Sequence, residues 1–141
     1  MSTFLLSMLL VAPASATEND APLKGCIYEL IERESASDDW RARSVSVHNL
    51  DSGPEFQRID LQAGKEYLLM ACGTTDVAEL TLMVYDNRSA YRSPLEFAER
   101  TEESMHAFTF TPHHSGTYSI GVSATADGDA PADVSLGLAQ R

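Results

Sequence analysis

Two adjacent histidines followed by a serine are the residues of this chain that most suggest a reactive centre. His113, His114 and Ser115 stand together in the stretch TPHHSGTYSIGV. Adjacent residues of a strand point to opposite faces, so the two imidazoles can share one metal ion only within a turn. A third protein ligand would be needed, and the nearest further histidine is His106. We favour a simpler interpretation: the stretch is the polar tip of a β-hairpin, and His113 and His114 are candidate ligand contacts.

Serine catalysis at Ser115 is not indicated by the surrounding sequence. The G-x-S-x-G elbow is absent, and no strand-to-helix turn is predicted there to expose a nucleophile. We therefore expect a protein that is not an enzyme and has no catalytic residues. A small hydrolase is the remote alternative, because a catalytic triad is recognised by geometry and not by the order of its residues in the chain.

Three aspartates within one short segment suggest a calcium site. Asp127, Asp129 and Asp133 offer carboxylate oxygens at close range, and loop carbonyls would complete the ligand shell of a hard cation. The spacing lacks the glutamate that closes an EF-hand loop, and Asp and Gly are also favoured in ordinary turns. We expect no obligatory cofactor, with calcium at these three residues as the alternative.

An aromatic platform for a sugar ring is a further candidate, offered by four residues: Trp40, Tyr85, Tyr91 and Tyr118. Aromatic side chains of a small domain mostly belong to its core. Tyr91 differs because the neighbouring Pro94 limits its segment to a poor edge strand. Tyr91 is therefore the aromatic residue that we expect to contact a ligand.

The first residues resemble a cleavable export signal. Residues 4–11 form an apolar run too short to span a bilayer, and Ala14-Ser15-Ala16 supplies the small residues required for cleavage. No cysteine stands at the cleavage point to carry a lipid. We expect residues 1–16 to be a signal peptide, and the mature protein to be periplasmic or secreted without membrane insertion.

Two cysteines, Cys26 and Cys72, are present. In an exported chain the simplest expectation is that they form one disulfide. A zinc site would be the alternative, but the wide spacing does not provide the C-x-x-C pair typical of structural zinc.

The charge balance limits the partners of the protein. The chain has 10 Lys and Arg against 21 Asp and Glu, a formal net charge of −11. Such a surface repels phosphate backbones and anionic headgroups, which argues against nucleic acid and membrane surfaces as partners. The partner that we expect is an unidentified protein or polysaccharide.

Hydrophobic periodicity predicts one helix followed by short strands. Apolar residues at helical spacing predict a helix over 20–35, with Cys26 on its apolar face. A period of two then predicts strands at 45–47, 56–61, 66–72, 79–85, 105–111, 117–124 and 134–138, with a poor edge strand at 90–98. The segment 66–72 is apolar on both faces, as expected if a helix covers its outer side. We therefore expect an all-β antiparallel sandwich of seven or eight strands over 43–141, preceded by the helix and its connection over 17–42.

Three segments resemble the bacterial pre-peptidase C-terminal domain over roughly residues 56–140. They are IDLQAGKEYLLMA, LTLMVYDNRSA and FTFTPHHSGTYSIGV. The positions that match the family pattern are Leu61, Ala63, Gly64, Tyr67, Asp76, Leu80, Leu82, Val84, Tyr85, Asp86, Phe108, Phe110, Ser115, Gly116, Tyr118, Ile120 and Val122. The resemblance implies a jelly-roll-like β-sandwich. In that family the domain usually trails a secreted peptidase without being the catalyst, and some relatives bind calcium or an extracellular polymer such as collagen.

The sequence therefore favours a periplasmic or secreted, non-catalytic binding or interaction module of the pre-peptidase C-terminal type. A calcium-stabilised or carbohydrate-binding β-sandwich is the alternative.

Overall fold

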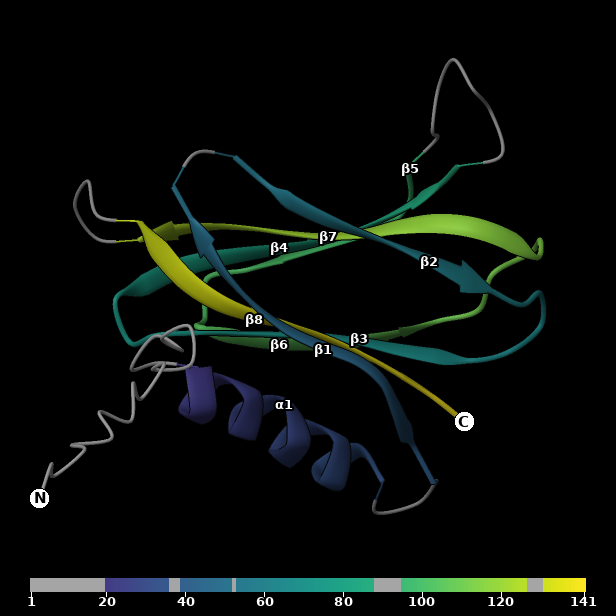
Figure 1. The fold of residues 1–141 in the computed structure, drawn as a ribbon, viewed down its shortest axis with the longest axis horizontal. Helices are drawn as coiled ribbons and strands as arrows, with labels where there is room; N and C mark the ends of the chain where they lie inside the picture. Colours follow the sequence, from purple (N-terminus) through teal and green to yellow (C-terminus); the bar gives the residue numbers. More distant parts are fainter. Residues whose placement is uncertain (1–19, 36–38, 52, 88–94, 127–130) are drawn as a thin grey trace, which may run out of the picture.

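Two antiparallel β-sheets of four strands each pack face to face, and one helix lies against the outer side of one of them (Figure 1). The computed structural model describes residues 20–35, 39–51, 53–87, 95–126 and 131–141. The elements in chain order are α1 (Asp20–Glu34), β1 (Arg41–Leu50), β2 (Glu55–Leu61), β3 (Tyr67–Gly73), β4 (Val77–Asp86), β5 (Leu95–Thr101), β6 (Met105–Phe110), β7 (Gly116–Ala126) and β8 (Ala132–Gln140). The predicted jelly-roll-like all-β sandwich with one N-terminal helix is confirmed.

Consecutive strands fall in different sheets, except for β4 and β5, which both belong to the second sheet. The first sheet has the order β1-β8-β3-β6, and the second has the order β2-β7-β4-β5. All pairings are antiparallel. β5 pairs only with β4 and is an edge strand, as the poor strand pattern around Pro94 predicts, although it runs from Leu95 to Thr101 and so ends three residues beyond the predicted limit at Ala98.

The core lies between the two sheets and follows the predicted alternation. Inward side chains of the second sheet are fully buried, among them Leu80, Leu82 and Val84 on β4 and Ile120 and Val122 on β7. They meet the inward side chains of β3 and β8 in one continuous apolar cluster. Burial at every second position is the expected result of a strand with one face on the core.

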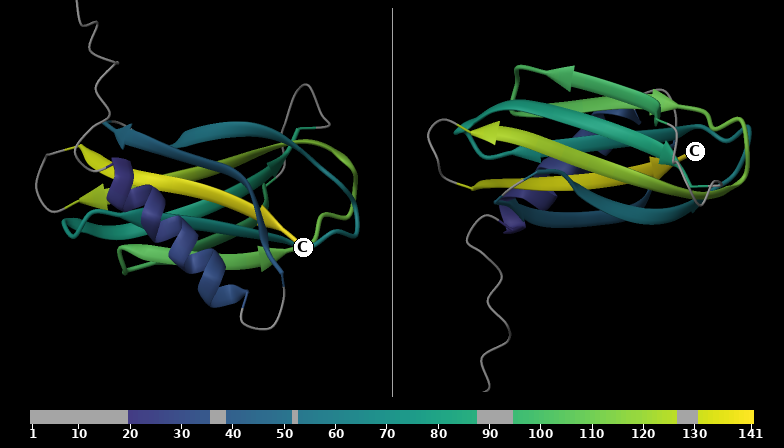
Figure 2. Two further views of the ribbon diagram at one scale, coloured as in Figure 1. Left: turned by 60° about the horizontal axis from the view of Figure 1, so that its bottom comes forward. Right: turned by 90° about the horizontal axis from the view of Figure 1, so that it is seen from above.

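Helix α1 covers the outer face of the first sheet and forms a second apolar cluster there (Figure 2, left). Its buried residues Leu23, Ile27, Leu30 and Ile31 face β1, β8 and β3. Close approach depends on Gly137 of β8, because a Cβ atom at that position would lie 2.5 Å from Cγ2 of Ile27. The cover that α1 provides explains why β3 is apolar on both faces, as predicted.

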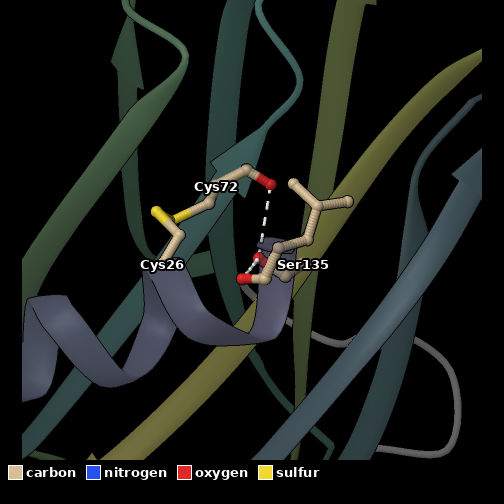
Figure 3. Close-up of a disulfide and its surroundings, with 4 residues drawn as sticks. Cys26, Cys72 and Ser135 are labelled. Atoms are coloured by element: carbon tan, nitrogen blue, oxygen red, sulfur yellow. Dashed lines mark hydrogen bonds between the residues drawn. A yellow bond between two sulfur atoms is a disulfide. The ribbon is translucent and has the colours of Figure 1, made fainter. Parts of the chain in front are cut away.

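The disulfide between Cys26 and Cys72 joins α1 to β3 (Figure 3). The two Cα atoms are 6.3 Å apart, and 46 positions separate the residues in sequence. Beside the disulfide, the buried hydroxyl of Ser135 donates a hydrogen bond to the carbonyl oxygen of Leu23 at 2.9 Å. The predicted pairing is confirmed, and the zinc alternative is excluded for these two sulfurs.

The prediction of a hairpin at residues 111–116 is wrong. β6 pairs with β3 in the first sheet, whereas β7 pairs with β2 and β4 in the second, so the segment between them crosses from one sheet to the other. The 62–66 segment between β2 and β3 makes a similar crossing beside it. The two crossings are joined by hydrogen bonds from Gly64 N to Pro112 O at 3.0 Å and from Ala63 N to Ser115 Oγ at 2.8 Å. The reversal is therefore stabilised by a neighbouring connection and not by pairing of its own flanking strands.

The described part of the chain includes no helix that is long and apolar enough to cross a membrane.

Candidate functional site

The outer face of the second sheet differs from that of the first because no described element packs over it (Figure 1; Figure 2, right). Alternation along the strands sends Phe56 and Arg58 of β2, Ser119 and Gly121 of β7, and Tyr85 of β4 to this face. A ligand that approaches this part of the second sheet therefore meets the side chains of these strands directly.

Phe56 is the aromatic side chain that this face exposes most clearly among the described residues, with 44% of its surface accessible. Leu95 of β5, which stands opposite Tyr85, adds a second exposed apolar side chain to the face at 52%. Phe56 stands directly opposite Gly121 in the β2–β7 register. A Cβ atom at position 121 would overlap Cδ1 and Cε1 of the Phe56 ring. The ring therefore occupies the space that any larger residue at this position of β7 would fill.

Tyr85 fixes the Phe56 ring from the side of β4. The two ring centroids are 5.6 Å apart with an interplanar angle of 74°, an edge-to-face arrangement that aromatic pairs prefer. The Tyr85 hydroxyl points toward Sδ of Met83 at 4.0 Å. We call Phe56 and Tyr85 the aromatic platform.

Polar groups border the aromatic platform on one side. Nδ2 of Asn87 donates a hydrogen bond to Oγ of Ser119 at 2.6 Å, and the backbone N of Asn87 donates to the carbonyl oxygen of Thr117 at 3.0 Å. Because Ser119 accepts in this bond, its own hydroxyl hydrogen can be donated to a ligand. Phe56, Tyr85, Asn87 and Ser119 together line a shallow hollow of about 250 Å³.

The described residues that line this hollow are two aromatic side chains, one amide and one hydroxyl. An exposed ring next to an amide and a hydroxyl is the usual composition of a binding site, in which apolar surface gives affinity and a few polar groups fix orientation.

The histidines predicted as ligand contacts lie elsewhere. His113 and His114 are exposed on the crossing between β6 and β7, and the Tyr118 hydroxyl donates to the carbonyl oxygen of His114 at 2.6 Å. Gly116 begins β7, five residues from Gly121, which corresponds to roughly 16 Å along the strand. The structure therefore does not bring the two histidines onto the aromatic platform.

The predicted calcium ligands are described only in part. Asp133 is half-buried on β8, where its Oδ1 accepts a hydrogen bond from Nδ2 of Asn49 at 2.7 Å. Asp127 and Asp129 lie outside the described residues, as does Tyr91. Within the described ranges, no group of three or more His, Cys, Asp or Glu side chains is arranged to hold a metal ion.

Two of the aromatic residues expected in the core are there, and one is not. Trp40 and Tyr118 are buried at 8% and 1% exposure. Tyr85 is half-buried on the outer face of β4, so its assignment to the core is wrong. Sequence reasoning also missed Phe56, although its spacing from Ile59 and Leu61 places it on the opposite face of the same strand. That alternation could have indicated an outward-facing phenylalanine.

Comparison with known proteins identifies no family. No family model matches the chain, and no curated protein matches it. Among solved structures, it is similar to one described as "CBM4 structure and function", with 16% identity, a TM-score of 0.44, and coverage of 72% of this chain and 78% of that one. The β-sandwich implied by the resemblance to the pre-peptidase C-terminal domain is confirmed, and membership of that family stays a prediction.

Proposed function

We propose that this protein is a non-catalytic binding module and that the aromatic platform of Phe56 and Tyr85 is the centre of its binding surface. One observation supports this proposal above the others: Phe56 is exposed on the sheet face that no described element covers, and Gly121 makes room for it. Exposed apolar side chains grouped beside polar ones often mark interaction sites on soluble proteins.

The disulfide supports a module that works outside the cytoplasm. Cysteine pairs form and persist in oxidising compartments such as the periplasm and the extracellular space. In this proposal residues 1–16 are removed on export, residues 17–42 provide the helix that is fixed to the sandwich, and residues 43–141 present the binding face. The ligand is a polymer of the surroundings, either a polysaccharide or a protein.

Retention on insoluble polymers tests the proposal. Mature protein is incubated with cellulose, chitin, peptidoglycan and gelatin-coated beads, and the bound fraction is measured after washing. We expect at least one polymer to retain the wild type and to lose most of that retention with Phe56→Ala.

A matched control comes from the other side of the molecule. Tyr28 on α1 is 52% exposed and is therefore a comparably open aromatic side chain away from the aromatic platform. Tyr28→Ala should be retained like the wild type. Equal retention of Phe56→Ala and wild type, or loss of retention only with Tyr28→Ala, would contradict the proposed site.

A further inference from the structure

We propose, building on the proposed function, that the ligand is a neutral carbohydrate chain and that one of its pyranose rings stacks on Phe56. The inference comes from the match between three properties of the site and the chemistry of a sugar: one exposed aromatic ring, adjacent hydroxyl and amide groups, and an acidic chain.

The aromatic ring offers the surface that one face of a pyranose ring needs. A sugar ring carries C–H groups on its faces and hydroxyl groups around its edge, so one face can stack against an aromatic side chain while the edge stays polar. Two contacts hold the Phe56 ring in position: its packing on the β7 backbone at Gly121 and its edge-to-face contact with Tyr85. A ring that is already fixed loses little conformational freedom when a ligand binds.

The polar neighbours of the ring match the edge of a sugar. Sugar hydroxyls both donate and accept hydrogen bonds, and the Ser119 hydroxyl can donate to them beside the Asn87 amide. Arg58 stands directly opposite Ser119 on β2 and so continues the same polar row across the sheet. A ring placed on Phe56 would therefore find apolar contact beneath it and hydrogen-bonding groups at its edge.

The size of the site favours a sugar over a folded protein. A stable protein–protein interface buries about 800 Å² on each partner and usually contains several apolar anchors. This hollow of about 250 Å³ is close to the lower end of the volumes of small-molecule sites, which begin at about 300 Å³. Its scale therefore suits one ring of a chain, and the rest of the chain would pass over the sheet.

Charge distinguishes neutral from anionic carbohydrates. The whole chain carries a formal net charge of −11, which repels polyuronates and sulfated polymers at low ionic strength. On the same face of β2, the Asp60 carboxylate follows Arg58 by two positions. The local field is therefore mixed, and it offers no concentrated positive charge to a polyanion.

Titration of ¹⁵N-labelled protein with soluble oligosaccharides tests the inference. The probes are the hexasaccharides of cellulose, xylan, chitin and laminarin, with hexagalacturonate as the anionic comparison. We expect at least one neutral probe to shift the amide signals of Phe56, Tyr85, Ser119 and Gly121 in a saturable way. Hexagalacturonate should bind at least about tenfold more weakly, a difference that should narrow as salt screens the charge.

Two variants test the role of the ring. Phe56→Ala removes the ring, and Gly121→Ala keeps Phe56 but forces it from its position. Each should weaken the neutral sugar by about tenfold or more, while Tyr28→Ala should bind like the wild type. Removal of Phe56 also removes its contacts with Tyr85 and Gly121, so a modest fall in melting temperature is expected. Binding is therefore measured well below the melting temperature of every variant, which separates weaker binding from unfolding.

The possible outcomes separate this inference from the proposed function. Retention on gelatin that requires Phe56, with no shift by any neutral oligosaccharide, would overturn the carbohydrate ligand and keep the binding surface. Preference for hexagalacturonate would overturn the neutral class. Shifts confined to residues away from the aromatic platform, or no binding to any sugar or polymer, would overturn the proposed site as well.

Discussion

Replacing Cys26 and Cys72 together by alanine tests how much the disulfide contributes to stability. The cross-link restricts the unfolded chain over a sequence separation of 46 residues. Loop-closure entropy for that length gives about 4 kcal/mol of stabilisation. For a domain of about 120 residues, a loss of that size lowers the melting temperature by roughly 16 °C. Alanine is the suitable replacement because Cys72 is 1% exposed and a serine hydroxyl there would need a buried partner.

Urea denaturation of the oxidised wild type and of the double alanine variant measures the loss. Wild type treated with a thiol reductant is the matched control, and it should show a similar loss because it lacks the same cross-link. Helix α1 should remain folded on the first sheet in both, since Leu23, Ile27, Leu30 and Ile31 stay buried there. A loss below about 1 kcal/mol would refute the entropic reasoning, which requires a large effect from a loop of this length. Loss of α1 helicity while the sandwich stays folded would show that packing alone cannot hold the helix.

Four further predictions concern the helix and a possible metal. Gly137→Ala should destabilise the protein by about 1–3 kcal/mol, because its new Cβ would overlap Ile27. Gly25→Ala is its control: it adds a methyl group where nothing lies within 4 Å and should stabilise α1 by up to about 1 kcal/mol. Urea denaturation measures the stability of both glycine variants, and equal effects would contradict the packing argument. Ser135→Ala should cost about 0.5–1.5 kcal/mol in the same assay, because it removes one buried hydrogen bond to α1 while the Leu23 carbonyl keeps its helical donor; an unchanged stability would show that this bond contributes nothing. Millimolar calcium should leave the melting temperature where EDTA leaves it, because the Asp133 carboxylate is engaged by an asparagine of β1; a rise would show that calcium binds the native state and contradict this expectation.

Most of the fold could be predicted because burial imposes a short-range pattern on the sequence. Alternation in β4 and β7 identifies their inward residues, since each strand has one face on the core. The apolar stripe of α1 and the apolar outer face of β3 predict that the helix packs on this strand, because both apolar surfaces must be buried. The cysteines add the contact between them.

The crossing of His113 and His114 between sheets could not be predicted, because strand pairing is a long-range property. A chain reversal with Gly116 at its end suits a hairpin or an inter-sheet crossing equally well. The choice is made by the pairing of β6 with β3 and of β7 with β2, which neighbouring residues do not encode. The 62–66 connection that stabilises the crossing is also distant in sequence.

The aromatic platform depends on register for the same reason. Phe56 and Gly121 are 65 positions apart in the sequence and become neighbours only in the β2–β7 ladder. Neither residue indicates a site alone, since an exposed phenylalanine is common and a strand glycine has several explanations. Tyr85 was assigned to the core because its residue type favours burial, and the outward phase of β4 decides otherwise.

The position of β8 has a consequence for the order in which the molecule can form. β8 is the last of the described strands, yet it lies between β1 and β3 and is the hydrogen-bonded neighbour of both. Until residues 132–140 have been synthesised, β1 has no partner in its sheet and α1 lacks the strand against which Ile27 packs. The first sheet can therefore be completed only after β8 has been synthesised, because β8 is the strand that joins β1 to β3.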